Sequence, residues 1–324
     1  MKKEKTKNNP GAIHWGYSNR IFHDGRTVEN VLNILRPGDE LLMGSQLYNI
    51  SADYLLNSCK KLGVSVQQTE AKNADSILNN ISKKTRMIWL ESPSGPTLRL
   101  FDLAALSLTA RQHNITLVVD NTLGSPLLQN PSTFGVDILL HRHIPALKAK
   151  TQQSVGVVLS REREGCDINN QREAGISSFF KTSSLWFEKF NSEINRQSEN
   201  SSQVAKFLEA SPSVARIYYP GHAGHPNFTF ARQFLKTGGN LLSFYLEEDT
   251  PEAAERIMRK FHLFRTPAEN KEDRSLMNQP SQTTFGHFPA YMKRRAGIRD
   301  SLLWLYVGKE PVDDLLENLE RVLK

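Results

Sequence analysis

The chain has 324 residues, enough for two domains, and its composition of 39% hydrophobic and 23% charged residues is that of an ordinary globular protein, which excludes extended disorder. The net charge of +7 is spread along the chain and favours anionic partners only weakly. Cys59 and Cys166 are the only cysteines, and their spacing suits neither a disulfide framework nor a metal site.

The N-terminus begins with lysines but carries no apolar stretch behind them, so it does not resemble a signal peptide. No run in the sequence approaches the roughly 20 apolar residues that a membrane helix needs. We therefore expect a cytoplasmic protein that makes no membrane contact, with a flexible basic leader over residues 1–11.

Short apolar runs alternate with helix-period segments through the first half of the chain, a pattern typical of parallel strands joined by helices. Ser51 and Asp102 are the expected N-caps of two of these helices. The expected strands are 40–43, 64–67, 86–91, 115–120, 136–141 and 154–159. We predict a large α/β domain over 12–190, with a mostly parallel central sheet.

The second half of the chain has fewer elements. Residues 179–210 have helical periodicity and predict one long helix or a pair of helices. Strands are expected at 240–246 and 301–307, with a helix beginning at Pro251 and a closing amphipathic helix beginning at Val312. A smaller α+β domain is therefore expected over 191–324.

Asp120 ends the apolar run that begins at Ile115 and is the most informative carboxylate in the sequence. Ligands of α/β sheets gather beyond the carboxyl ends of the strands. A carboxylate buried there needs a cationic or donor partner, such as a protonated heterocyclic nitrogen, although by spacing alone a role in a cap or turn is favoured. Polar turns also follow Glu91 and His141, so the three strand ends predict a ligand crevice.

The histidines do not predict a metal site. His141 and His143 have strand spacing but no evident third ligand, and His222 and His225 lie in a turn-rich segment. The dinucleotide, P-loop and hydrolase-elbow motifs are also absent from the sequence.

Together these segments resemble the transsulfuration group of fold-type I pyridoxal-phosphate (PLP) enzymes, the cystathionine γ-synthase, β-lyase and γ-lyase relatives. The resemblance covers nearly the whole chain. The matching pieces are Arg36-Pro-Gly-Asp39, Glu91-Ser-Pro93, Val119-Asp-Asn-Thr122, Ser125-Pro126, Gln129-Asn-Pro131, Gly135-Val-Asp-Ile138, Leu305-Tyr-Val-Gly308 and Val312-Asp-Asp-Leu315. It implies an aminotransferase-like fold with helices on both faces of the sheet, a PLP cofactor, sulfur amino acid substrates and active sites formed between subunits.

Some functional residues of the family are kept. The resemblance places Tyr48 where a tyrosine stacks on the cofactor ring, and Asp120 where an aspartate pairs with the pyridinium nitrogen. It places Ser275 near the carboxylate of the substrate.

Other functional positions differ. Pro145 stands where the family has its Schiff-base lysine, and Arg142 and Ile144 replace the hydroxyls that hold the cofactor phosphate. Asp24 falls at the helix start that binds the same phosphate, where it would repel it. Trp304 replaces the arginine that binds the carboxylate of the substrate.

Three hypotheses follow from these differences. The first is a pseudoenzyme that binds PLP weakly and non-covalently if at all, as a homo-oligomer or as the partner of an intact paralogue. The second is an active PLP-dependent C–S lyase or synthase that uses Lys148 or Lys150. The third, a nucleic-acid or anion binder, is supported only by net charge and is not expected; its candidate cations are Arg142, Lys148, Lys150, Lys293, Arg294 and Arg295.

Overall fold

The computed structural model describes residues 17–47, 52–70, 73–142, 155–161, 184–264, 274–286 and 288–324. The chain divides into two compact units. Unit 1 comprises Met1–Ser92 and Phe101–Asn191, and unit 2 comprises Pro93–Leu100 and Ser192–Lys324. The backbone therefore passes from one unit to the other after Ser92, after Leu100 and after Asn191.

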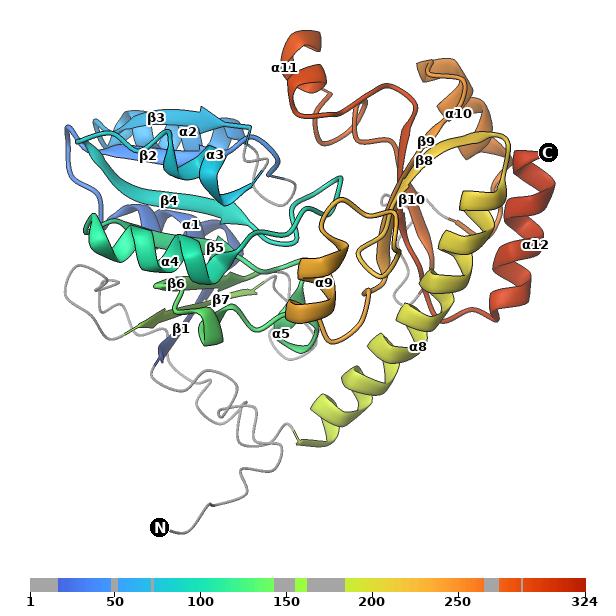
Figure 1. Ribbon diagram of the computed structural model, residues 1–324, viewed down its shortest axis with the longest axis horizontal. Coiled ribbons are helices and arrows are strands. Elements are labelled where there is room, and N and C mark those ends of the chain that lie inside the picture. The colour runs from blue at the N-terminus through green and yellow to red at the C-terminus, as the bar shows by residue number, and fades with distance from the viewer. Residues whose placement is uncertain are drawn as a thin grey trace. The chain divides into compact units, whose positions relative to one another are not determined.

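Unit 1 is built on a seven-stranded sheet in the order β1-β7-β6-β5-β4-β2-β3 (Figure 1). Its strands are β1 (Tyr17–His23), β2 (Glu40–Gly44), β3 (Ser65–Thr69), β4 (Thr85–Glu91), β5 (Thr116–Asp120), β6 (Ile138–His141) and β7 (Val155–Arg161). Strands β3, β2, β4, β5 and β6 pair in parallel, whereas β7 runs antiparallel to both β6 and β1. The carboxyl ends of β4, β5 and β6 consequently meet at one edge, where Glu91 pairs with Asp120 and Asp120 with Leu140.

Helices cover both faces of this sheet, as expected for a parallel sheet buried on both sides (Figure 1). They are α1 (Asp24–Leu32), α2 (Ala52–Lys61), α3 (Ala74–Leu78), α4 (Leu103–Gln112) and α5 (Ser125–Leu128), with a 3₁₀ turn η2 (Pro131–Phe134). Helix α4 packs Leu103, Leu106 and Ala110 against the sheet. The side chain of Asp102 accepts the Ala105 N–H at 2.9 Å, which confirms the expected cap; the other expected cap, Ser51, lies outside the described residues.

The strands expected in the first half of the chain are confirmed to within two residues at each end. Strand β1 was not expected from the sequence. It carries Ser18, Asn19 and Arg20 in place of a continuous apolar run, because among the described strands it lies at the edge of the sheet and pairs with β7 alone.

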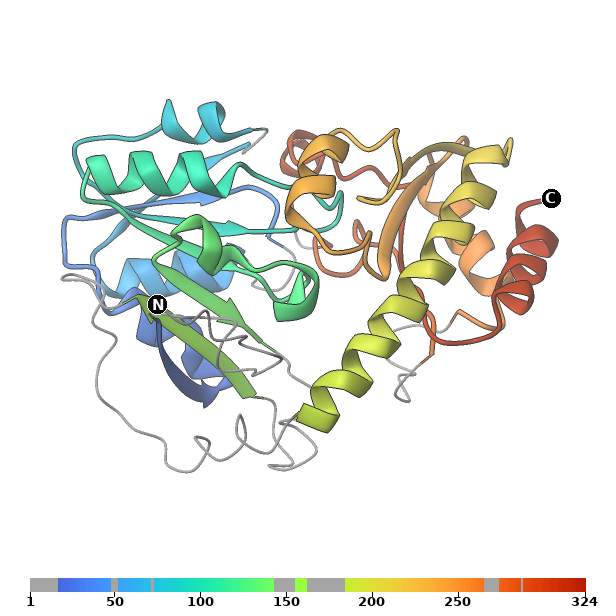
Figure 2. The same cartoon turned by 60° about the horizontal axis from the view of Figure 1, so that its bottom comes forward.

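Unit 2, whose residues from Ser192 onwards are drawn in yellow-green to red in Figure 2, contains a four-stranded antiparallel sheet in the order β10-β11-β9-β8. Its strands are β8 (Val214–Tyr218), β9 (Leu241–Leu246), β10 (Leu276–Asn278) and β11 (Leu302–Tyr306). Its helices are α9 (Phe228–Phe234), α10 (Pro251–Lys260), α11 (Ala290–Arg295) and α12 (Val312–Leu323), with the part of α8 (Ser184–Ala210) that begins at Ser192. None of the described helices is both long and apolar enough to cross a membrane.

The second half of the chain was predicted less completely. Helices α8, α10 and α12 and strands β9 and β11 correspond to expected elements, and α8 is one helix rather than a pair. Strands β8 and β10 and helices α9 and α11 were missed, because they are only three to seven residues long and show no clear period.

A strap of eight residues, Pro93–Leu100, leaves β4 and belongs to unit 2. Hydrogen bonds that join it to the rest of that unit include Ser243 Oγ to Pro96 O at 2.7 Å, His225 Nε2 to Thr97 O at 3.3 Å and Leu100 N to Asn227 Oδ1 at 3.3 Å. After the strap, the chain re-enters unit 1 at Phe101, and helix α4 begins at Leu103, so the strap connects β4 and α4 of unit 1 by way of unit 2.

Candidate functional site

Asp120 lies at the carboxyl end of β5 and is 1% exposed. Its Oδ1 accepts hydrogen bonds from the backbone N–H of Thr122, at 3.0 Å, and from the hydroxyl of the same residue. Its Oδ2 is buried, accepts no hydrogen bond and lies 3.5 Å from Nε of Arg142. The structure thus gives this carboxylate a cation from the chain itself.

Arg142 directly follows β6 and is 9% exposed. Its backbone N–H donates to the hydroxyl oxygen of Thr122 at 2.9 Å. Because β5 and β6 are parallel neighbours, Asp120, Thr122 and Arg142 form a closed loop of contacts, which we call the Asp120 corner. The corner fixes the ends of the two strands to each other.

A buried carboxylate is costly unless a charge or hydrogen bonds compensate it. At the Asp120 corner the hydroxyl and amide of Thr122 compensate Oδ1, and the guanidinium of Arg142 compensates the charge. A protonated ring nitrogen at Oδ2, which the resemblance implies, would meet that guanidinium at the same oxygen. Two cations at one carboxylate repel each other.

The strand edge beside the corner is also tied together by side-chain hydrogen bonds. Asn121 Nδ2 donates to Gln129 O at 2.9 Å, and Gln129 Nε2 donates to Ser92 Oγ at 3.4 Å. All three residues are buried, so the ends of β4 and β5 are fixed to the turn that follows α5.

Ser275, which the resemblance places near a substrate carboxylate, precedes β10 and is completely buried. Its N–H donates to Glu310 Oε1 at 2.7 Å and its hydroxyl donates to Glu310 Oε2 at 3.0 Å. The same hydroxyl oxygen accepts the N–H of Gly308 at 2.9 Å. We call these contacts the Ser275 corner; they direct both donors of Ser275 to a carboxylate of the chain.

Trp304 lies in the middle of β11 and is 6% exposed. Its neighbours Leu303 and Leu305 belong to the hydrophobic core of unit 2, so the alternation of the strand places Trp304 on the opposite face of the sheet. In register it lies opposite Ser243 of β9 and Asn278 of β10. An indole therefore occupies the position at which the resemblance implies a guanidinium.

Several of the predicted site residues lie outside the described residues: Tyr48, His143, Ile144, Pro145, Lys148 and Lys150. Asp24 is the first residue of α1. The structure therefore brings together two of the predicted cofactor residues, Asp120 and Arg142, in unit 1. It places the two predicted substrate residues, Ser275 and Trp304, in unit 2.

Within the described part of the chain, no group of three or more His, Cys, Asp or Glu side chains could hold a metal ion. His222 contacts Glu209 at 2.8 Å. His225 is buried, its Nε2 bonds to Thr97 O, and its Nδ1 accepts the N–H of Asn227 at 3.1 Å. Burial, together with the smaller effect of the nearby charge of Arg216, lowers the pKa of His225 to about 4, so this ring is neutral near pH 7.

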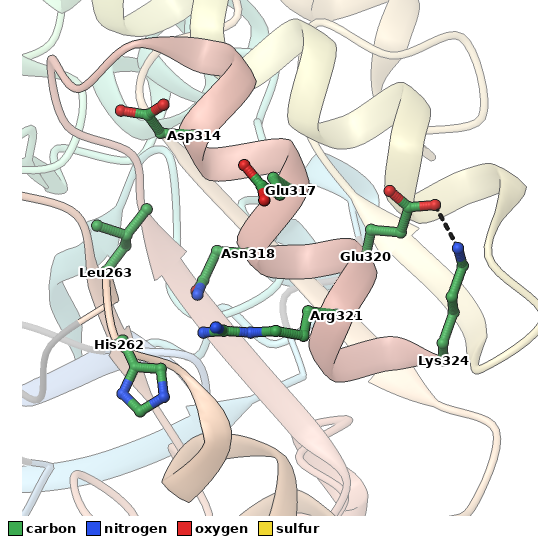
Figure 3. Close-up of a pocket in the computed structure, with 8 residues that line it drawn as sticks. All are labelled: His262, Leu263, Asp314, Glu317, Asn318, Glu320, Arg321 and Lys324. Atoms are coloured by element: carbon green, nitrogen blue, oxygen red, sulfur yellow. Dashed lines mark hydrogen bonds and ion pairs between the residues drawn. The ribbon is translucent and has the colours of Figure 1, made fainter.

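A surface pocket of about 600 Å³ lies in unit 2, between α12 and the residues that follow α10. Figure 3 draws the residues that line it. Its lining residues are His262, Leu263, Asp314, Glu317, Asn318, Glu320, Arg321 and Lys324. Its charges are mixed, and Lys324 already pairs with Glu320. None of the residues that the sequence predicts for the site lines this pocket.

Comparison with known proteins decides the family. The model of the family described as "Cys/Met metabolism PLP-dependent enzyme" matches residues 15–324. This chain belongs to that family.

Relatives in the family have lyase or synthase activities. L-methionine gamma-lyase of Pseudomonas putida is 28% identical over 313 residues, which cover 93% of this chain and 77% of the relative. Cystathionine beta-lyase of Coxiella burnetii is 28% identical over 302 residues, covering 90% of this chain and 77% of the relative.

Solved structures of the family confirm the fold class. Cystathionine gamma synthase from Xanthomonas oryzae pv. oryzae, in complex with aminoacrylate and cysteine, has a TM-score of 0.82 and 26% identity, covering 97% of this chain and 82% of the relative. Cystathionine gamma-lyase from Lactobacillus plantarum, complexed with L-serine, has a TM-score of 0.80 and 25% identity, covering 96% of this chain and 83% of the relative. The chain therefore has the fold-type I architecture of a transsulfuration-like, PLP-dependent family.

Proposed function

We propose that this chain is a pseudoenzyme of the family, a cytoplasmic homologue that has lost its lyase or synthase chemistry and acts in binding or as a partner subunit. The observation that carries this proposal is the pairing of the buried Asp120 with Arg142. Where the family reserves the aspartate for a cofactor, this chain supplies its own cation. The described residues thus do not fit a protonated PLP ring bound in the manner of the family.

Two further features support the proposal. The sequence has Pro145 at the position that the resemblance assigns to the Schiff-base lysine, and proline has no side-chain amine. That lysine both holds the cofactor and moves protons, so its replacement removes two functions together. In unit 2, Glu310 already occupies both donors of Ser275, and Trp304 provides no guanidinium for a substrate carboxylate.

The test is the absorbance spectrum of the purified chain with added PLP, before and after borohydride, followed by peptide mapping. We expect the spectrum of free PLP and no trapped lysine. A visible band that borohydride fixes on Lys148 or Lys150 would overturn the proposal and establish the alternative, an active enzyme with a relocated lysine. Lys148→Ala and Lys150→Ala then show which amine reacts, and L-methionine gamma-lyase is the positive control.

The partner-subunit version has its own test. Active sites in this family form between subunits, so a degenerate chain could complete or regulate the site of an intact paralogue. We expect such a paralogue to co-purify with this chain from its native source. A self-contained homodimer without it would contradict the partner-subunit version but not the loss of catalysis.

A further inference from the structure

We infer that Arg142 is a built-in counter-ion that fills a site for an aromatic cation at Asp120, and that removing its guanidinium reopens that site. The inference deepens the proposed function. It rests on that function in one respect: it takes Arg142 as the replacement for the cation of a ligand. It predicts a ligand class for the Arg142→Ser variant: a flat heteroaromatic cation with a ring N–H.

The geometry at Oδ2 is the first argument. This oxygen is buried and accepts no hydrogen bond, and the Nε of Arg142 lies 3.5 Å from it, beyond the usual hydrogen-bond distance. The guanidinium therefore compensates the charge of Asp120 without satisfying Oδ2 as an acceptor. A ligand with a cationic N–H would satisfy both requirements.

The anchoring of Asp120 is the second argument. Its Oδ1 is held by the amide and hydroxyl of Thr122, and these contacts do not depend on the guanidinium. The backbone N–H of Arg142, which donates to the Thr122 hydroxyl, is present whichever side chain stands at position 142. Shortening Arg142 to serine therefore removes the counter-ion and leaves the carboxylate oriented, with space where the guanidinium lay.

The experiment measures the thermal melting of the full chain with and without 4-aminopyridine, a planar cation that keeps its ring N–H at neutral pH. Arg142→Ser is expected to melt on the order of 10 °C below the natural chain, because it leaves a buried charge uncompensated. Millimolar 4-aminopyridine is expected to recover several degrees in this variant and none in the natural chain.

Two controls isolate the interaction. Neutral pyridine has the same ring but no charge, and we expect it to stabilise neither protein. Adding Asp120→Asn to Arg142→Ser should abolish the response to 4-aminopyridine, because it removes the anion. Arg86→Gln, at an exposed arginine of β4, is the matched arginine control and should melt like the natural chain.

The inference fails if the natural chain is stabilised as much as Arg142→Ser, or if pyridine acts as well as the cation. If Arg142→Ser does not fold, Arg142→Gln is compared with Arg142→Gln/Asp120→Asn. The double variant should then melt higher than the single one, and equal or lower melting would overturn the inference. No outcome depends on a lysine side chain of the protein or on catalytic activity, so the proposed function stands or fails separately.

Discussion

The Asp120 corner of unit 1 and the Ser275 corner of unit 2 each contain a residue to which the resemblance assigns a ligand, and in both corners the chain itself binds that residue. They differ in completeness. Glu310 accepts both donors of Ser275 at 2.7 and 3.0 Å, whereas Arg142 approaches Oδ2 of Asp120 only to 3.5 Å. The Ser275 corner is therefore saturated with hydrogen bonds, while the Asp120 corner retains an unused acceptor.

If the chain is a pseudoenzyme, as we propose, this difference describes two ways of closing a ligand site. In unit 2 the hydrogen bonds lie within the fold, so a ligand would have to break them at a cost of about 1–3 kcal/mol for each buried group left unpaired. In unit 1 one side chain supplies the compensating charge, and one substitution removes it. We expect a single substitution to restore binding in unit 1 but not in unit 2.

The largest predicted effect breaks the saturated corner. Glu310→Ala leaves the amide and hydroxyl of Ser275 without their acceptor in a fully buried position, and we expect a loss of about 4 kcal/mol in the free energy of unfolding. Urea unfolding measures this loss. Lys309→Ala is the control: Lys309 forms a partly exposed ion pair with Glu193 at 3.2 Å, and its removal should cost under about 1 kcal/mol. Equal losses would show that the Ser275 corner is not a special source of stability.

The next prediction concerns the pH dependence of stability. Like the Ser275 corner, the buried neutral ring of His225 in unit 2 has hydrogen-bond partners within the fold. The folded pKa of His225 is about 4, below the ordinary value of 6.5, so the unfolded state binds the proton first. The stability from His225 is complete above about pH 6.5 and is lost as the pH falls towards 4, by about 3 kcal/mol.

Urea unfolding at several pH values measures this slope. His225→Gln should show a correspondingly smaller slope between pH 6.5 and 4, since it has no imidazole to protonate. An unchanged slope in this variant would mean that other groups cause the loss in acid.

The smallest predicted effect weakens the Asp120 corner while keeping both charges. Thr122→Val removes the hydroxyl that donates to Asp120 and accepts the N–H of Arg142, and we expect a loss of about 1.5 kcal/mol in the free energy of unfolding. Thr133→Val, at an exposed threonine whose hydroxyl donates to Asn130 O, should change stability by less than about 0.5 kcal/mol. A Thr122→Val loss no larger than this would show that the ion pair alone holds the corner.

Much of unit 1 could be predicted because its parallel strands are short apolar runs, as in β5, where every residue is buried. Strand β1 could not, because its pattern depends on pairing with β7, more than 130 positions along the chain. In unit 2, β10 has only three residues, too few for a period to be visible.

The candidate site shows the same limit. The sequence identifies Asp120 as a strand-end carboxylate, and the resemblance places Arg142 where it implies a hydroxyl, but neither reveals the contact between them. That contact depends on the register of β5 and β6, which the spacing of residues does not reveal. Glu310 was missed because nothing in the sequence links it to Ser275, 35 residues earlier.

The strap has a consequence for how this protein can be divided. Because Pro93–Leu100 interrupts unit 1 to join unit 2, no single cut in the polypeptide yields two complete pieces. A fragment that begins at Ser192 lacks Pro96, Thr97 and Leu100, whose partners Ser243, His225 and Asn227 would lose their hydrogen bonds. During synthesis the strap leaves the ribosome more than 120 residues before those partners, so unit 2 can be completed only after most of the chain has been made.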